Sequence, residues 1–334
     1  MESFIEPGIA FILWIQSLGA WLASPMKMIS FLGNEEFYLF VAPAIYWCLD
    51  ARLGLRLGIS LMLSGMINSG FKLALHGPRP YWLDAQVQAF SAETSFGVPS
   101  GHSQNAAVVW GVLARRVNTG WSWLLAGLIV ALIGISRMVL GVHFPHDVFF
   151  GWLIGAILLW AIIRWEGKFL AWFTRFRLTQ QIFLALGASL VLILFIALIR
   201  ILLGDYQVPQ AWIVAAAQAT PEADPIAPLA LSGIVSNAGT LFGLVAGGIW
   251  LHQKGWMDAG GELWKRLLRF LIGVIGVFIL WFGLGEIFPR GETLLPFALR
   301  YLRYALVGFW ISGLAPWLFM RIRIAESAKG SLQK

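Results

Sequence analysis

Long apolar runs dominate the chain and restrict the folds that it can adopt. Ten such runs are separated by polar segments, and they cover residues 7–23, 37–49, 53–75, 100–116, 121–140, 144–163, 182–203, 227–251, 267–288 and 295–319. A helix of about 20 apolar residues crosses the hydrocarbon core of a bilayer. Only 12% of the residues are charged, against about 25% in a typical soluble domain. The sequence therefore predicts an all-α, polytopic membrane helix bundle.

A basic linker divides the apolar runs into a group of six and a group of four. Arg164, Lys168, Arg175 and Arg177 lie between the sixth and the seventh run. We predict a six-helix core over residues 1–168 and about four further transmembrane helices over residues 178–325. The second region has no cluster of His and Asp residues, and its sequence indicates no role.

The basic residues indicate how the bundle is oriented. The net charge is +7, but the basic residues lie in loops between apolar runs, which favours lipid headgroups over nucleic acid as their partners. When alternate loops share one side of the membrane, sixteen of the 24 Lys and Arg residues fall on one side. Cytoplasmic loops carry such an excess. We therefore expect a multi-pass protein of the plasma (inner) membrane, with the poorer side facing out.

Three polar clusters fall on this outer side, so they can share one site. They read KLALHGPRP at residues 72–80, PSGH at residues 99–102 and SRMVLGVHFPHD at residues 136–147. In the third cluster His143 and Asp147 are four residues apart, so they lie on one face if a helix begins near Pro145. A carboxylate on one imidazole nitrogen leaves the other nitrogen free to act as a nucleophile.

Three cations accompany these histidines near the ends of different predicted helices. A single Lys or Arg at such a depth can simply extend its charge to the interface. Lys72, Arg79 and Arg137 together, on the side poorer in positive charge, favour a bound polyanion such as phosphate. Ser100 is placed as the N-cap of the fourth helix, and Gly101 allows a close approach of the backbone to an anion there.

The spacing of the clusters resembles the three-part signature of the type 2 phosphatidic acid phosphatase superfamily, which includes the vanadium haloperoxidases. That signature is K-x6-RP, PSGH and SR-x5-H-x3-D, and every fixed position is matched here. The stretch GNEEFYLFVAPAIYWCLD also resembles the start of the sphingosine-phosphate phosphatase branch. The resemblance covers about the first 165 residues and implies a membrane bundle with one site.

The resemblance also implies a role for each matching residue. His143 would form a phosphohistidine, Asp147 would orient it, and His102 would protonate the leaving lipid oxygen. The remaining residues of the signature would hold the phosphoryl oxygens, and these are Lys72, Arg79, Ser100, Gly101 and Arg137. No metal or other cofactor is expected. Asp84 and Glu93 are predicted to structure the loop, and His76 and His146 to have no direct role.

These observations predict an integral membrane phosphatase that hydrolyses a lipid phosphomonoester or diphosphate without a metal. Two alternatives stay open. The phosphohistidine can pass its phosphoryl group to another lipid instead of water, or the four C-terminal helices can form a lipid-translocating unit fused to a phosphatase. The motifs identify neither the lipid nor an oligomeric state.

Overall fold

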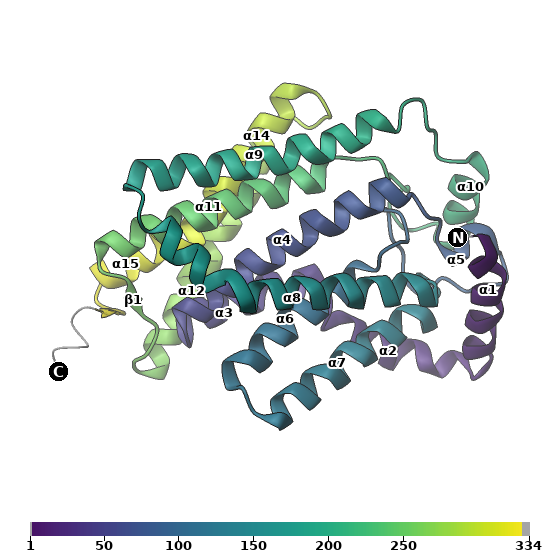
Figure 1. Ribbon diagram of the computed structural model, residues 1–334, viewed down its shortest axis with the longest axis horizontal. Coiled ribbons are helices and arrows are strands. Elements are labelled where there is room, and N and C mark those ends of the chain that lie inside the picture. The colour runs from purple at the N-terminus through teal and green to yellow at the C-terminus, as the bar shows by residue number, and fades with distance from the viewer. Residues whose placement is uncertain (1, 329–334) are drawn as a thin grey trace. The chain divides into compact units, whose positions relative to one another are not determined.

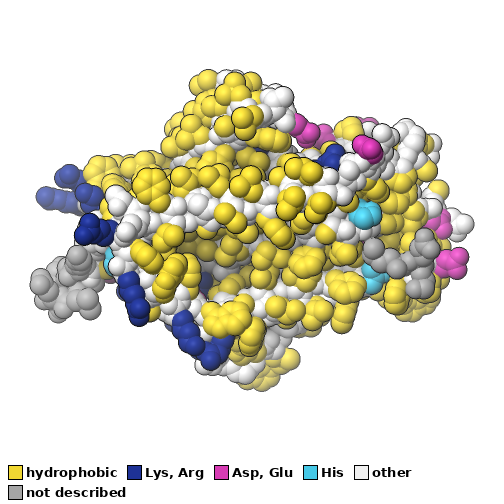
Figure 2. All heavy atoms as spheres, turned by 45° about the horizontal axis from the view of Figure 1, so that its top comes forward, with side chains coloured by type: hydrophobic (Ala, Val, Ile, Leu, Met, Phe, Trp, Pro, Cys, Tyr) yellow, Lys and Arg dark blue, Asp and Glu magenta, His cyan; other side chains and the backbone are white. Residues whose placement is uncertain are grey.

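Helices make up almost all of the computed structural model, which describes residues 2–328 (Figure 1). Seven of them are long and apolar enough to cross a membrane, in segments 51–83, 120–139, 145–173, 178–202, 232–254, 263–287 and 294–321. Hydrophobic side chains cover much of the visible surface (Figure 2), and residues such as Trp160 and Leu194 are more than half exposed. The predicted all-α membrane bundle is confirmed.

The first compact unit comprises residues 1–37, 67–163 and 196–230. Its helices, some of which continue beyond it, are α1 (Glu2–Ser17), α2 (Ala23–Phe31), α4 (Ala51–Leu75), α5 (Pro80–Leu83), α6 (Gly101–Val117), α7 (Gly120–Val139), α8 (Pro145–Phe173), α9 (Leu178–Leu202) and α10 (Gln210–Ala219). A short 3-10 turn, Ala20–Leu22, precedes α2. All three polar clusters belong to this unit.

The second unit comprises residues 38–66, 164–195 and 231–334. Its elements are most of α3 (Glu35–Cys48), parts of α4, α8 and α9, then α11 (Ser232–Lys254), α12 (Leu263–Phe278), α13 (Leu284–Ile287), α14 (Leu294–Phe309) and α15 (Ala315–Arg321), with π turns at Ile279–Gly283 and Trp310–Leu314. Two short strands, β1 (Met257–Asp258) and β2 (Glu326–Ser327), pair antiparallel. Small residues let α11 approach α14 closely: a Cβ on Gly243 would lie 2.1 Å from the backbone oxygen of Ala305.

Each compact unit comprises several separate stretches of the chain, and the predicted division near residues 168–178 stays a prediction. The first unit includes residues 196–230, and the second includes residues 38–66. Helices α4, α8 and α9 each contribute residues to both units, because each has at least 25 residues. Of the basic linker, Arg164 and Lys168 lie in α8, and Arg175 and Arg177 lie between α8 and α9.

The N-terminus also differs from its prediction. A single apolar segment was expected over residues 7–23. Helix α1 ends at Ser17, and Gly19 has a φ of 126°, a conformation that favours glycine. The following helical stretch, residues 20–48, is bent by 92° from the first, as in a broken span or a re-entrant loop. Pro25 lies in the first turn of α2, where the missing N–H is tolerated.

Close contact between α6 and α8 positions the second cluster against the third. A Cβ on Gly151 would lie 2.5 Å from the backbone oxygen of Ser100, and one on Gly155 would lie 2.7 Å from the backbone oxygen of Gln104. Backbone atoms cannot give way as a flexible side chain can. Glycines on α8 are therefore required for the observed distance between the two helices.

We predict that Gly151→Ala destabilises the protein by about 1–3 kcal/mol, as overpacked sites do. The measurement is thermal unfolding in detergent micelles. Gly127→Ala on α7 is the control, because a Cβ there meets no heavy atom within 4 Å and alanine favours a helix. Equal melting temperatures for the two variants would show that the α6–α8 contact tolerates a methyl group.

Candidate active site

His143 lies in the turn between α7 and α8 and is held on both ring nitrogens. Its Nδ1 is 3.2 Å from Asp147 Oδ2, and its Nε2 is 3.2 Å from Arg79 Nη1. A guanidinium can only donate hydrogen bonds, so Nε2 must be the acceptor and Nδ1 must carry the proton. The backbone N–H of Phe144 also donates to Asp147 Oδ2, at 2.9 Å. The arrangement leaves a lone pair on Nε2, directed at a cation.

Arg79 is fully buried and ties the loop after α5 to this turn. Its Nε donates to the backbone oxygen of Ser95 at 2.7 Å, and its Nη1 donates to that of Val142 at 2.9 Å. Its Nη2 donates to the backbone oxygen of Phe96 at 3.0 Å. The hydroxyl of Ser95 accepts a further bond from Lys72 Nζ at 2.7 Å. Lys72 and Arg79 are therefore joined through one serine.

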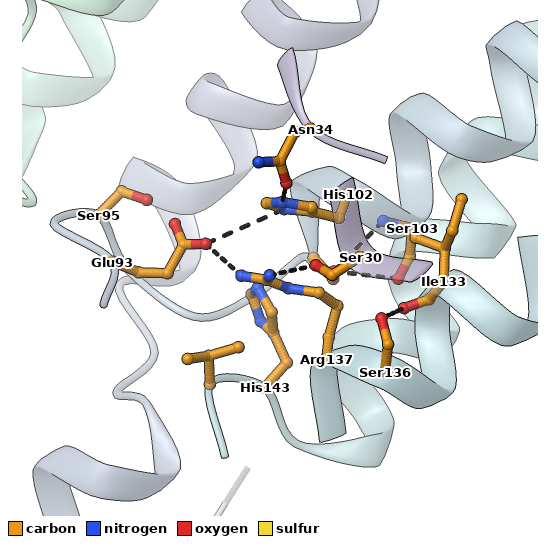
Figure 3. A network of polar contacts seen from close by, with 12 residues as sticks. Ser30, Asn34, Glu93, Ser95, His102, Ser103, Ile133, Ser136, Arg137 and His143 are labelled. Atoms are coloured by element: carbon orange, nitrogen blue, oxygen red, sulfur yellow. Dashed lines mark hydrogen bonds and ion pairs between the residues drawn. The ribbon is translucent and has the colours of Figure 1, made fainter. Parts of the chain in front are cut away.

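Arg137 enters the same cluster from the last turn of α7 (Figure 3). Its Nη1 donates to the hydroxyl of Ser30 at 2.6 Å, and its Nη2 forms an ion pair with Glu93. Glu93 also lies 3.6 Å from Arg79 Nη2 and 4.0 Å from His102 Nδ1. The buried Nε of Arg137 has no hydrogen-bond partner among the described residues. One carboxylate thus occupies the centre of the cationic cluster.

His102 faces the cluster from the first turn of α6. Its Nε2 is 2.6 Å from Asn34 Oδ1, while its Nδ1 is the nitrogen that faces Glu93. The preceding Ser100 is buried and caps α6, accepting hydrogen bonds from the backbone N–H of Ser103 at 3.4 Å and from its hydroxyl at 3.0 Å. The backbone N–H of Ser100 donates to the backbone oxygen of Asp147 at 2.9 Å, which links the start of α6 to the start of α8.

Burial and charge shift the pKa values of two groups that lie outside the membrane-spanning segments. Burial lowers the pKa of His143 well below its usual value, and the nearby cations, Arg79 first, lower it further. His143 is therefore neutral near pH 7, as a nucleophile must be. Burial alone would raise the pKa of Glu93, but Arg137 and Arg79 outweigh it, so that the pKa is lowered and the carboxylate is charged.

The structure brings the residues of the three clusters together as the sequence predicts. Lys72, Arg79, His102, Arg137 and His143 all belong to one network with Asp147, whereas Ser100 is engaged in capping α6. The prediction for Asp84 holds, since its Oδ1 accepts from the backbone N–H of Gln86 at 2.8 Å. His76 contacts the rings of Phe96 and Tyr206. His146 stacks on Phe144, and its Nε2 lies 3.2 Å from Asp147 Oδ1 without hydrogen-bond geometry.

Four residues at the site were not identified from the sequence. Glu93 was predicted only to structure its loop, but it pairs with two arginines. Ser95 and Ser30 were not singled out, and Asn34 was noted only within the stretch GNEEFYLFVAPAIYWCLD, without a role at the site. The sequence offered one indication for Glu93: it is a carboxylate six residues before PSGH, in a chain whose clusters contain three cations without an obvious partner. The other three are small polar residues of common types, and only the fold reveals their contacts.

Within residues 2–328, no group of three or more His, Cys, Asp or Glu residues is arranged to hold a metal ion. The acidic groups near the histidines are taken up by other partners, Asp147 by His143 and Glu93 by Arg137. Metal independence stays a prediction that needs an assay.

Comparison with known families agrees with this geometry. Residues 53–171 match the model of the PAP2 superfamily, and residues 235–327 match a second model described as "PAP2 superfamily phosphatase, transmembrane extension". The two segments cover more than half of the chain, and the first contains all three clusters. The chain belongs to the PAP2 superfamily. The resemblance inferred from the motifs is confirmed.

The chain resembles phosphatases whose names indicate different substrates. It is 32% identical over 185 residues to glucose-6-phosphatase 3 of Bos taurus, covering 48% of this chain and 53% of that protein. It is 27% identical over 321 residues to glucose-6-phosphatase catalytic subunit 1 of Haplochromis nubilus, covering 87% and 88%. It is 29% identical over 161 residues to phosphatidylglycerophosphatase B of Bacillus subtilis, covering 44% and 77%. The chain spans about half the length of the first of these relatives.

We predict that Glu93→Gln strengthens the binding of a tetrahedral oxyanion by roughly tenfold. The substitution removes one negative charge from the centre of this PAP2 site but keeps an oxygen that can accept from Arg137. The measurement is titration of the purified protein with inorganic orthovanadate. Asp84→Asn makes the same charge change on the same loop, outside the cluster, and should leave the affinity unchanged. Weaker or equal binding by Glu93→Gln would contradict the prediction.

Proposed function

We propose that this PAP2 superfamily member is a membrane phosphatase that transfers a phosphoryl group to His143 and then to water. One observation carries the proposal: Asp147 accepts a hydrogen bond from Nδ1–H of His143, while the Nε2 lone pair of His143 faces the cationic cluster. A neutral nucleophile beside fixed positive charge suits attack on a phosphate, whose oxygens gain or keep negative charge as the reaction proceeds.

In the first proposed step, the Nε2 lone pair of His143 attacks phosphorus and the bond from phosphorus to the leaving oxygen breaks. His102 donates a proton to that oxygen, so the product leaves as an alcohol. Nδ1 of the phosphohistidine keeps its proton and its hydrogen bond to Asp147. The carboxylate stabilises the positive charge that the ring gains. Lys72, Arg79 and Arg137 hold the phosphoryl oxygens, together with Ser100 and the backbone N–H of Gly101 at the start of α6.

In the second proposed step, His102 has lost its proton and can act as a base. It takes a proton from water, whose oxygen attacks phosphorus as the N–P bond breaks. The electron pair returns to Nε2 of His143, inorganic phosphate leaves, and both histidines regain their starting states. The three cations supply the charge stabilisation that a metal supplies in other phosphatases, so no step needs a metal ion. An alcohol in place of water would make the same site a phosphotransferase.

We propose a lipid phosphate or diphosphate as the substrate, and a site on the non-cytoplasmic face. Lys72 and Arg137 each lie in the last turn of a helix that is long enough to span a membrane, which favours a site just below the headgroups. The excess of basic residues in the other loops supports this orientation. The full-length similarity to a glucose-6-phosphatase favours a second candidate, a soluble sugar phosphate.

We predict that His143→Ala lowers phosphate release by at least ~10³-fold, because the covalent intermediate cannot form. Asp147→Asn should lower it by ~10²–10⁴-fold without unfolding the protein, since the ring loses its orientation. The assay is phosphate release by purified protein from long-chain lipid phosphates in the presence of EDTA. His76→Asn is the control, since the His76 ring contacts Phe96 and Tyr206, and it should stay active. Full activity of His143→Ala would reject the mechanism.

We predict that kcat/KM is much higher for a long-chain lipid phosphate than for glucose 6-phosphate. Burial of an alkyl chain contributes about 0.8 kcal/mol for each CH2 group, and this binding energy can position the phosphate against His143. The measurement compares both esters in mixed micelles at constant surface concentration of the lipid. A higher value for glucose 6-phosphate would favour the second candidate and exclude a lipid-selective site.

A further inference from the structure

The tip of the bent N-terminal helices contacts the site from outside the matched family segment. Ser30, near the end of α2, accepts from Arg137 Nη1 at 2.6 Å, and Asn34, just before α3, contacts His102 Nε2 at 2.6 Å. Both residues lie before residue 53, where the match to the PAP2 superfamily begins. Neither belongs to the three-part signature. The stick view shows Asn34 beside His102 and Ser30 beside Arg137 (Figure 3).

Gly33 allows this tip to approach the two helices that carry His102 and Arg137. A Cβ on Gly33 would lie 2.7 Å from a methyl carbon of Ile133 on α7 and 3.6 Å from the Cβ of His102 on α6. The turn is braced internally, because the backbone N–H of Asn34 donates to the backbone oxygen of Phe31 at 3.0 Å. Helix α2 also packs along α7. Asn34 is thus held beside His102 by several contacts.

The contact with Asn34 determines which nitrogen of His102 is available. An amide oxygen can only accept a hydrogen bond, so Nε2 of His102 must carry a proton. The other nitrogen, Nδ1, is the one that faces Glu93 and the cationic cluster. A proton delivered to a leaving group, and one later taken from water, must therefore pass through Nδ1.

We propose that Asn34 is a positioning residue that fixes the orientation and tautomer of His102, so that Nδ1 acts as the general acid and then as the base. The inference rests on the proposed phosphatase function. Each histidine then has its own hydrogen-bond acceptor: Asp147 accepts from Nδ1 of His143, and Asn34 accepts from Nε2 of His102. In the transfer step the proton on Nδ1 of His102 moves to the leaving oxygen as the P–O bond breaks. Nε2 of His102 keeps its proton and its hydrogen bond to Asn34.

An amide suits this position better than a carboxylate. An anchoring carboxylate would stabilise the imidazolium form and make His102 a weaker acid, whereas an amide orients the ring without adding charge. The charged groups that act on His102 are Arg137 from α7, Glu93 from the loop before α6, Lys72 from α4 and Arg79 from the start of α5. Replacing Asn34 with Asp adds one negative charge to this set.

The test compares two substrates that differ in their need for a proton. An alkyl phosphate requires protonation of its leaving oxygen, whereas p-nitrophenyl phosphate releases a stable anion. Asn34→Ala should lower kcat/KM by about 10²-fold for the alkyl phosphate, which is the scale of general acid catalysis, and by under about threefold for p-nitrophenyl phosphate. The comparison uses kcat/KM because this quantity depends only on the steps up to and including phosphoryl transfer to His143, and not on the later hydrolysis. Glu36→Gln, in the exposed first turn of α3, is the control and should resemble the unmodified protein.

Asn34→Asp keeps an acceptor for Nε2 and provides a second readout. It should restore most of the kcat/KM for the alkyl phosphate. It should also move the alkaline limb of the pH profile up by about one unit, because a raised pKa keeps the acid protonated at higher pH. The proposal would be overturned if Asn34→Ala lowered kcat/KM equally for both substrates and Asn34→Asp left the alkaline limb of the pH profile unchanged. Asn34 would then have only a structural role. Activity that survives His143→Ala would reject the phosphatase mechanism instead, so the two failures are distinguishable.

Discussion

The site depends on holding three cations close together at the end of an apolar bundle. Charges there are unfavourable unless hydrogen-bond acceptors or anions meet them. The loop before α6 supplies most of these partners: Ser95 meets Lys72 and Arg79, and Glu93 meets both arginines. This pairing keeps the cations in place before any ligand arrives. Under the proposed function, a phosphate would have to share the cations with Glu93 or displace it, so the contacts that stabilise the cations would oppose its binding.

Around the cations, the two histidines are oriented in complementary ways. Each has one ring nitrogen anchored by an oxygen acceptor and the other directed at the charged cluster. The anchors differ in charge, and this matches the proposed chemistry. A carboxylate supports the ring that becomes an imidazolium bearing phosphorus, while a neutral amide supports the ring that must give up a proton. Glycines on α8 maintain this geometry, because they let α6 and α8 meet at backbone distance.

The sequence predicted the helical membrane class and the members of the cluster because both leave local signals. Apolar runs reveal spans, and the spacing of Lys72, Arg79, His102, Arg137, His143 and Asp147 reveals a shared site. Glu93 and Asn34 were missed because their contacts join segments far apart in the chain, and a single polar residue in a loop has no distinguishing pattern. The break near Gly19 was missed for a related reason, since residues 7–23 are mostly apolar and only Gln16 and Ser17 precede the break. Helices α4, α8 and α9 each contribute residues to both compact units, and no local pattern in the sequence indicates this.

The central claim is a covalent bond between phosphorus and Nε2 of His143, and trapping that intermediate tests it most directly. Purified protein would be mixed with radiolabelled lipid phosphate, quenched within milliseconds in base and digested for mass spectrometry. The account predicts a label that is stable in base, labile in acid and located on the peptide that contains His143. His143→Ala should carry no label under the same conditions. Label found on another residue, or turnover with no labelled protein at any quench time, would contradict the account.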